Sequence, residues 1–396
     1  MPSSSTANSA NPPQARAGSG LQILIMAVAA FIIVTTEFLI VGLLPALARD
    51  LGISVALAGQ VVTLFAFTVM LFGPVLTAKV AHLDRKKLFI VILLVFAASN
   101  ALAAVATNIW VLALARFIPA LGLPVFWGTA SETAGQLAGP GNEGKGVSKV
   151  YLGISAALVF GVPLGTLAAD TVGWRGSFWI LVALSLSIAA LLHLCMPTLP
   201  ASPPKTEGHK QTAILKEPRF LAHVLLSILA FTAMFTAYTY LADILERLAH
   251  IPPSQVGWWL MGFGAVGMIG NQIGGRLVDR MPLGAMVLFL VVLGAGMLAA
   301  IPLADNRVGL VIALIAWGVA YTALFPICQV RVMQAGAKAQ ALAATMNISA
   351  ANAGIGLGAI FGGVGIGHFG LQSLGLIATA IAAVGVVLAL VMMRKG

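Results

Sequence analysis

The stretch Phe31-Ile-Ile-Val-Thr-Thr-Glu37-Phe-Leu-Ile-Val-Gly-Leu-Leu-Pro45 belongs to an apolar run that begins near Leu21 and is long enough to cross a bilayer. One carboxylate, Glu37, lies well inside this run. A charged side chain at the bilayer centre costs at least ~2.5–3.5 kcal/mol on insertion scales, so such residues tend to face a protein interior and to serve a function. We therefore expect Glu37 to face an interior space rather than lipid.

The composition of the 396-residue chain is that of an integral membrane protein. Hydrophobic residues make up 60% and charged residues 9%, which is too little charge to cover a soluble protein of this size. The net charge of +10 is explained by orientation in a membrane and does not indicate nucleic acid binding. The sequence contains no phosphate-binding Gly-x-x-x-x-Gly-Lys-Ser/Thr loop and no histidine pair at metal-ligand spacing. We expect no enzymatic activity, no metal and no cofactor.

Twelve apolar segments are each long enough to span a bilayer as a helix, with ~20 residues as the criterion. They cover residues 21–47, 57–80, 87–107, 109–136, 146–170, 175–197, 219–247, 255–279, 283–303, 307–334, 338–367 and 370–393. The longest polar break follows the sixth span. The predicted fold is therefore an all-α membrane protein with a disordered tail (1–20), an N-terminal six-helix half (21–197), a linker (198–218) and a C-terminal six-helix half (219–396).

The distribution of Lys and Arg predicts the orientation. With the N-terminus in the cytoplasm, 17 of these residues lie on the cytoplasmic side and four on the other, and Arg116 lies within a span. An even number of spans also places both termini on one side. We expect a multi-pass protein of the inner (plasma) membrane with both termini in the cytoplasm.

Arg116 is the natural partner for Glu37. Each lies about seven residues from the outer end of its predicted span, so both lie about 10 Å deep at ~1.5 Å per residue. We infer that the two charges face a central cavity and influence each other, directly or through water. Two alternatives remain open: a fixed ion pair that only joins the first and fourth spans, and a Glu37 side chain that reaches water at the span end.

Several motifs resemble those of the Major Facilitator Superfamily. Thr36-Glu37-Phe38-x-x-Val41-Gly-Leu-Leu-Pro45, Ala115-Arg116-Phe-Ile-Pro-Ala-Leu-Gly122 and Gly161-Val-Pro163-Leu-Gly165 look like segments of its twelve-span drug:proton antiporter branch. The closest likeness is to sugar-efflux, arabinose-related and purine-efflux exporters, and it covers the chain beyond the tail. In this branch the arginine of the fourth span is linked to proton transfer, so the resemblance implies proton-coupling roles for Glu37 and Arg116.

The loop after the second span departs from the family pattern, because His82 stands where the family usually has an aspartate. Glu132 is then a possible partner for this basic loop, although membrane orientation alone would also explain the loop charges. Gly161, Pro163 and Gly165 permit close helix approach and a kink, either as structure or as a hinge. The candidate gating residues are Lys79, Arg85, Lys86, Glu132, Gly161, Pro163, Gly165, Gly275, Arg276, Asp279 and Arg280.

Rings and amides inside the spans are the candidates for substrate contacts, because small-molecule pockets are mostly apolar with a few polar groups. The candidates are Trp127, Tyr238, Tyr240, Asn347 and Asn352. Tyr238 and Tyr240 are about 200° apart on a helix, so both cannot face one cavity squarely.

The sequence therefore predicts a secondary exporter of a sugar, a purine nucleoside or base, or a drug-like compound. It would be driven by the proton gradient, would work by alternating access, and would function as a monomer in the lipid bilayer. A proton-independent facilitator of the same fold is the main alternative. A membrane-embedded enzyme or receptor is a third, and would need a catalytic cluster or an extramembrane domain.

Overall fold

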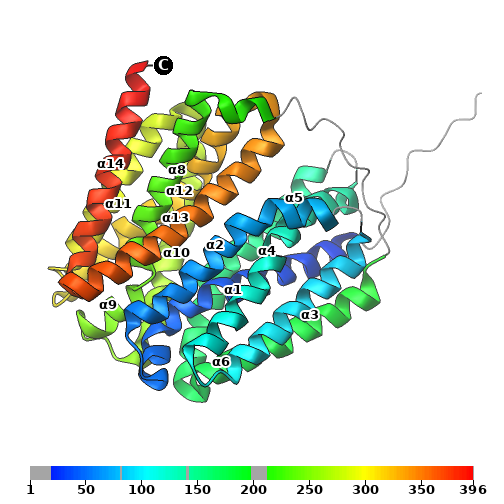
Figure 1. Cartoon of the computed structure of the whole chain (residues 1–396), viewed down its shortest axis with the longest axis horizontal. Coiled ribbons are helices and arrows are strands. Elements are labelled where there is room, and N and C mark those ends of the chain that lie inside the picture. Colours follow the sequence, from blue (N-terminus) through cyan, green and yellow to red (C-terminus); the bar gives the residue numbers. More distant parts are fainter. Residues whose placement is uncertain (1–18, 81–82, 140–141, 198–211, 396) are drawn as a thin grey trace, which may run out of the picture.

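The computed structural model describes residues 19–80, 83–139, 142–197 and 212–395, and this part of the chain is helical without strands. We call the helices between residues 19 and 195 the N-set and the helices between residues 218 and 395 the C-set (Figure 1). The N-set comprises α1 (Ser19–Leu51), α2 (Val55–Val80), α3 (Arg85–Ala104), α4 (Ile109–Ala138), α5 (Glu143–Ala156), the π-turn η1 (Ala157–Gly161) and α6 (Val162–Cys195). The C-set comprises α8 (Pro218–Tyr238), α9 (Leu241–Arg247), α10 (Pro253–Arg280), α11 (Pro282–Ala300), α12 (Arg307–Ala335), α13 (Gln340–Phe369) and α14 (Leu374–Lys395).

Local sequence signals set the ends of several helices. The Asn108 and Asn306 side chains each accept hydrogen bonds from the second and third backbone N–H groups of α4 and α12, which satisfies donors that have no partner inside the helix. At the other end, Gly139 closes α4 and Gly370 closes α13, with φ of 79° and 81°. Glycine adopts this left-handed conformation without the penalty that a Cβ would bring.

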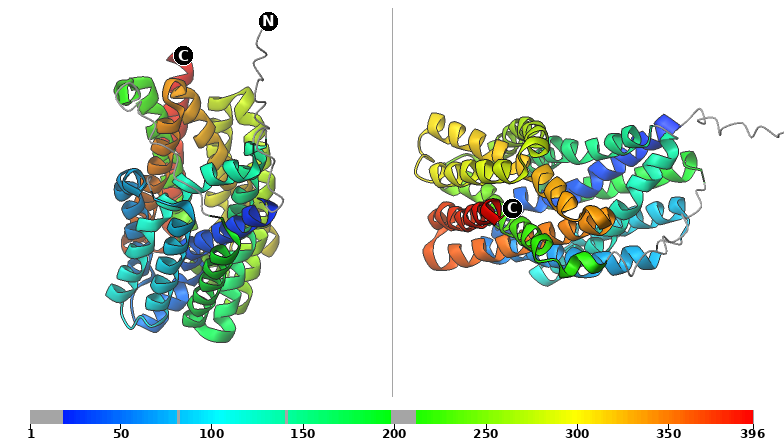
Figure 2. Two further views of the ribbon diagram at one scale, coloured as in Figure 1. Left: turned by 90° about the vertical axis from the view of Figure 1, so that its right-hand side faces the viewer. Right: turned by 90° about the horizontal axis from the view of Figure 1, so that it is seen from above.

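The long helices account for the twelve predicted spans. Ten segments of the described chain are long and apolar enough to cross a membrane, and one of them, Lys145–Cys195, has 51 residues. Gly173, with φ 72° and ψ 163°, interrupts that segment and divides it into two spans. The remaining span is α10, a 28-residue helix with several glycines and polar residues, which make it less apolar. Figure 2 shows that the axes of the long helices in both sets are roughly aligned with one another.

Successive membrane spans alternate in direction, which defines two ends of the molecule. We call the end at which α1 begins the near end and the opposite one the far end. The near end holds the basic loop before α3 and the last turn of α10, whereas the far end holds Leu51 and the first turn of α12. The sequence analysis predicts the near end to be cytoplasmic.

Two seams join the N-set to the C-set, and both lie in the far halves of their helices. In the first, α2 lies beside α13 (Figure 1), where Gln60 and Thr63 donate side-chain hydrogen bonds of 3.3 and 3.2 Å to the carbonyls of Ala359 and Gly356. In the second, α10 meets the segment around η1. A Cβ on Gly264 would lie 2.8 Å from the Leu158 carbonyl oxygen.

An ion pair adds to the far-end contacts, because Arg49 of α1 lies 2.5 Å from Glu246 of α9. Among the described residues, every recorded hydrogen bond or ion pair between the two sets lies in these far halves.

The near halves of the same helices contact their own sets instead. A Cβ on Gly274 of α10 would lie 2.5 Å from the Ala323 carbonyl oxygen of α12, and one on Gly153 of α5 would lie 3.0 Å from Ala30 of α1. The contacts of α10 with the N-set at Gly257 and Gly264 therefore lie in its far half, whereas α10 contacts α12 with both halves, at Phe263 and at Gly274. This arrangement is closed between the sets at the far end.

Candidate functional site

Arg116 anchors α4 to the middle of α1. Its guanidinium donates a 2.6 Å hydrogen bond from Nη1 to the Thr36 carbonyl and a 2.7 Å bond from Nη2 to the Glu37 carbonyl. The same group lies 4.6 Å from the ring centroid of Phe65 on α2. Arg116 is 1% exposed, and charge-assisted bonds together with the ring offset the cost of burying its charge. The guanidinium thus holds the backbone of α1 rather than the Glu37 carboxylate.

The Glu37 side chain is half-buried, whereas the residues on either side of it along α1 are buried. Its backbone carbonyl accepts a hydrogen bond from Arg116 of the N-set, and the ring of the next residue, Phe38, contacts Phe235 of the C-set. The carboxylate therefore lies between the two helix sets and not against lipid. The residues that the sequence analysis brought together do meet, and the contact between them runs through the α1 backbone.

Opposite Glu37, the C-set presents a group of packed rings, which we call the aromatic cluster. It consists of Phe231, Phe235, Tyr238, Phe263, Trp317, Tyr321 and Phe325. The rings of Tyr238 and Tyr321 have centroids 4.5 Å apart, and Phe235 contacts Phe38, the neighbour of Glu37, at 6.0 Å. Such ring pairs contribute about 0.5–1.5 kcal/mol each beyond their burial, so the cluster is a firm surface facing α1.

Tyr321 was missed in the sequence analysis. It is 2% exposed, and its buried hydroxyl has no hydrogen-bond partner among the described residues. Leaving such a group unpaired costs about 1–3 kcal/mol, so its retention calls for an explanation. The signal in the sequence is the spacing of Trp317, Tyr321 and Phe325, four residues apart in the tenth span, which places all three rings on one helix face.

The five predicted substrate residues fall in three places. Tyr238 belongs to the aromatic cluster. Tyr240 does not, because its hydroxyl donates a 2.8 Å hydrogen bond to the Ala359 carbonyl at the first seam. Trp127 contacts Tyr151 in the N-set, with ring centroids 5.3 Å apart.

The two amides lie on α13. The Asn347 amide donates to Gln329 Oε1 at 2.7 Å, and Asn352 donates to the Ile348 carbonyl. Both side-chain oxygens are buried, and within the part of the chain that the structure describes neither has a hydrogen-bond partner. Like the Tyr321 hydroxyl, they are polar atoms inside the C-set that remain available for another donor or for water.

The candidate gating residues divide into contacts within the N-set and exposed groups. Arg85 and Glu132 form a 3.0 Å ion pair that joins α3 to α4 at the near end, as proposed for Glu132. The Cβ positions of Gly161 and Gly165 are filled by Thr35 and Leu39 of α1, and a Cβ on Gly257 of α10 would lie 2.8 Å from the Pro163 carbonyl. Lys79, Arg276, Asp279 and Arg280 are exposed, Lys86 is half-buried, and Gly275 faces open space. His82 lies outside the described residues.

A second buried arginine, Arg331 of α12, is a further residue that sequence reasoning did not single out. It is 1% exposed, and it contacts His223 Nδ1 at 2.8 Å, the His223 carbonyl at 2.8 Å and Ser227 Oγ at 2.9 Å, all on α8. Because the guanidinium can only donate, His223 Nδ1 accepts this bond. In each set, an arginine of the fourth span is thus hydrogen-bonded to the first span: Arg116 of α4 to α1, and Arg331 of α12 to α8.

Comparison with known proteins agrees with this architecture. A family model described as Major Facilitator Superfamily matches residues 26–348 and 224–395. The chain belongs to the Major Facilitator Superfamily. The family and its fold are those of transporters, which are not enzymes, so this superfamily member is a multi-pass membrane transporter of small molecules.

Relatives of this superfamily member cover nearly its full length. The inner membrane transport protein YdhP of Escherichia coli is 34% identical over 364 residues, which are 91% of this chain and 93% of that protein. A protein of Helicobacter acinonychis named "Probable sugar efflux transporter" is 28% identical and covers 91% of this chain and 92% of its own length.

Solved structures show the same fold. A bacterial homologue of the human lysosomal transporter Spinster, in an inward-facing and unoccupied conformation, has a TM-score of 0.81 at 15% identity and covers 97% of this chain and 98% of its own. The nucleoside transporter NupG (D323A mutant) has a TM-score of 0.75 at 18% identity and covers 95% of this chain and 99% of its own.

Proposed function

We propose that this transporter is a secondary exporter that exchanges protons for a small organic molecule. The observation that carries the proposal is the position of Glu37, a half-buried acid on α1 between Arg116 of the N-set and the aromatic cluster of the C-set. Acids inside membrane spans mark ion pathways and proton relays. No cofactor is needed, because the proton gradient supplies the driving force.

The exchange follows alternating access. The N-set and the C-set act as two halves that rock around a central site. With the near end in the cytoplasm of a cell whose inner membrane holds the protein, the arrangement closed at the far end is inward-facing. Glu37 takes a proton when the site opens outward and releases it when the site opens inward. Arg116 keeps α1 and α4 joined throughout, because its bonds go to backbone carbonyls that do not titrate.

The substrate class remains a choice among sugars, purine nucleosides or bases, and drug-like compounds. Support comes from the names of the relatives, a sugar efflux transporter and a nucleoside transporter, and from the aromatic cluster with its unpaired hydroxyl. Rings and hydroxyls together suit a molecule with both apolar and hydrogen-bonding faces. We propose that the unit works as a monomer.

A pH jump tests proton coupling directly. Proteoliposomes containing the purified protein are loaded with sugars, nucleosides or antibiotics in turn, and the external pH is changed to impose a proton gradient. We expect a proton-coupled exporter to move at least one substrate against its concentration gradient. Flux that only follows the substrate gradient, whatever the pH difference, would identify the proton-independent facilitator instead.

Tyr240 and Tyr321 give a matched pair of predictions, because the Tyr240 hydroxyl donates a hydrogen bond and the Tyr321 hydroxyl has no partner among the described residues. Tyr240→Phe removes the bond to the Ala359 carbonyl, which contributes about 0.5–1.5 kcal/mol, so the melting temperature is expected to fall. Tyr321→Phe removes a hydroxyl that has no partner, so the melting temperature is expected to stay or rise, whereas transport is expected to fall because substrate or Glu37 loses a donor. Thermal unfolding in detergent and transport in proteoliposomes measure both. A Tyr321→Phe variant with wild-type transport would exclude a role for this hydroxyl.

A further inference from the structure

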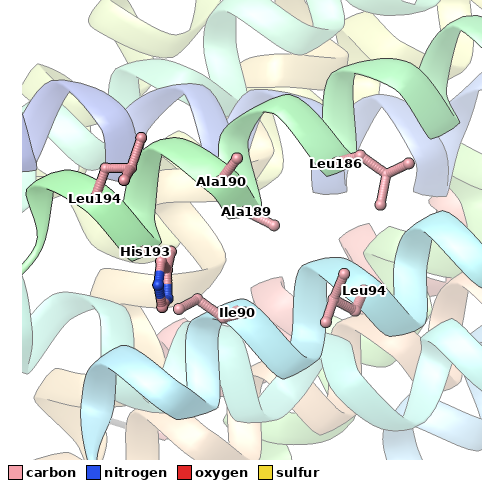
Figure 3. A pocket seen from close by; sticks show the side chains of 7 residues that line it. All are labelled: Ile90, Leu94, Leu186, Ala189, Ala190, His193 and Leu194. Atoms are coloured by element: carbon pink, nitrogen blue, oxygen red, sulfur yellow. The ribbon is translucent and has the colours of Figure 1, made fainter.

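A groove on the outer surface of the N-set lies between α3 and α6 (Figure 3). It has a volume of about 370 Å³ and is lined by Ile90, Leu94, Leu186, Ala189, Ala190, His193 and Leu194. Figure 3 shows His193 pointing from α6 toward Ile90 of α3 at one end of the groove. Because Leu94 and Leu186 are 45% and 47% exposed, the groove opens to the surroundings of the helices, which in this multi-pass protein are lipid.

Small residues create the groove. Leu186, Ala190 and His193 follow at intervals of four and three residues, so they share one face of α6. Ala189 and Ala190 leave the centre of that face without bulk, whereas Leu186 and Leu194 stand at its ends. Small side chains between two helices leave room for an acyl chain, and the burial of each CH₂ group of that chain contributes about 0.8 kcal/mol to binding.

The depth of the groove matches one leaflet of a bilayer. Leu94 lies nine residues into α3 from Arg85, and Leu186 lies nine residues from the end of α6 at Cys195. At ~1.5 Å per residue both are ~14 Å from the near end. The hydrocarbon core of a bilayer is ~30 Å thick, so one leaflet accounts for ~15 Å. The groove thus runs from headgroup level to about the end of a lipid tail.

The near end of the groove is basic. Lys87 is exposed and precedes Ile90 by three residues and Leu94 by seven, so it lies on the same face of α3, one turn nearer the membrane surface. His193 supplies ring nitrogens at the matching level of α6. The nearby Asp84 carboxylate is engaged as the N-cap of α3, where it accepts from the Lys87 backbone N–H at 2.9 Å. An ammonium group and an imidazole above an apolar slot complement a phosphate above an acyl chain.

We propose that this groove binds one anionic phospholipid of the near-end leaflet, with an acyl chain between α3 and α6 and its phosphate between Lys87 and His193. The site is separate from the one that contains Glu37. Of its two helices, α3 belongs to neither seam, and α6 contacts α10 at Pro163, before the break at Gly173, whereas the groove residues of α6 follow that break. Lipid binding and transport can therefore be measured separately.

The test is a titration of the purified full-length protein in detergent with dioleoyl phosphatidylglycerol or dioleoyl phosphatidylcholine, followed by native mass spectrometry. We expect tighter binding of phosphatidylglycerol. Lys87→Gln is expected to weaken it about fivefold, as for a single Lys at an anionic membrane surface, and Ala190→Phe to abolish it by filling the groove. Arg280→Gln is the matched control, because Arg280 is an exposed basic residue at the near end of α10, away from the groove. Melting temperatures confirm that each variant is folded.

Three outcomes would overturn the proposal. Equal affinity for the two lipids would mean that the basic end does not select the headgroup. Unchanged phosphatidylglycerol binding in both Lys87→Gln and Ala190→Phe would place the lipid elsewhere. A wild-type dimer that becomes monomeric in Ala190→Phe, with no lipid effect, would mean that a second copy of the chain occupies the groove.

Discussion

Glu37→Gln is expected to reduce proton-driven export to the level of protein-free liposomes while substrate still binds. The amide keeps the size of the side chain but cannot exchange a proton. The fold should survive, because Arg116 is held by the carbonyl oxygens of Thr36 and Glu37, which the substitution leaves in place. Uptake into everted vesicles or proteoliposomes with an imposed pH gradient measures export, and a thermal-shift assay measures binding.

Asp305→Asn is the matched control for this experiment. Asp305 is an acid at the far end whose side chain is 85% exposed, so loss of its charge should change neither export nor binding. If Glu37→Gln exports as fast as the wild type under the same gradient, Glu37 is not the coupling acid. If both variants lose export, the effect is one of net charge and not of position.

Gly264→Ala is expected to shift the protein from the far-closed toward the far-open state. The added Cβ would lie 2.8 Å from the Leu158 carbonyl oxygen and 3.1 Å from Val159 Cα, and backbone atoms cannot turn aside as a flexible side chain can. Overpacking of this kind costs about 1–3 kcal/mol, and 1.4 kcal/mol changes a population ratio about tenfold. Because the contact exists only where the two sets meet, separation of the far ends relieves it.

Distance measurements between spin labels at Ser54 and Val308, both exposed at the far end, would detect the shift as a longer mean distance. The matched control is Gly262→Ala in the same helix, where the added Cβ meets nothing within 4 Å. The control should keep the wild-type distances. A Gly264→Ala variant with unchanged distances would show that the α10 seam does not open in the transport cycle.

The fold followed from the sequence because span length and composition are dictated by the bilayer. Twelve segments of ~20 apolar residues leave few alternatives, and the basic loops mark one end. The approach of Arg116 to Glu37 was also predictable, since two opposite charges at one depth in an apolar chain have few other partners. The identity of the contacting atoms was not, because the sequence does not tell a carboxylate partner from a backbone carbonyl.

The π-turn η1 places Gly153 of α5 and Gly161 on one helix face, which their spacing in the sequence does not indicate. In an unbroken α-helix, Gly161 would lie about 80° around the axis from Gly153, eight residues earlier. The π-turn at Ala157–Gly161 takes up one additional residue, which returns Gly161 to the face of Gly153. Both then contact α1, at Thr35 and at Ala27 and Ala30. A local irregularity of this kind depends on tertiary packing, so propensity alone does not reveal it.

Glu37 of α1 lies level with the part of α10 where the contacts with the N-set at Gly264 give way to the contact of Gly267 with α12. A Cβ on Gly264 would meet Leu158 of the N-set, whereas a Cβ on Gly267, about one turn closer to the near end, would meet Thr322 of α12. Gly42 of α1 meets Leu260 of α10. Glu37 lies five residues, or ~7.5 Å, closer to the near end than Gly42. Five residues toward the near end from Leu260 along α10 is position 265. In the alternating-access cycle proposed above, the acid would therefore lie at the level where the two sets part, and it would be exposed to the two sides of the membrane in turn.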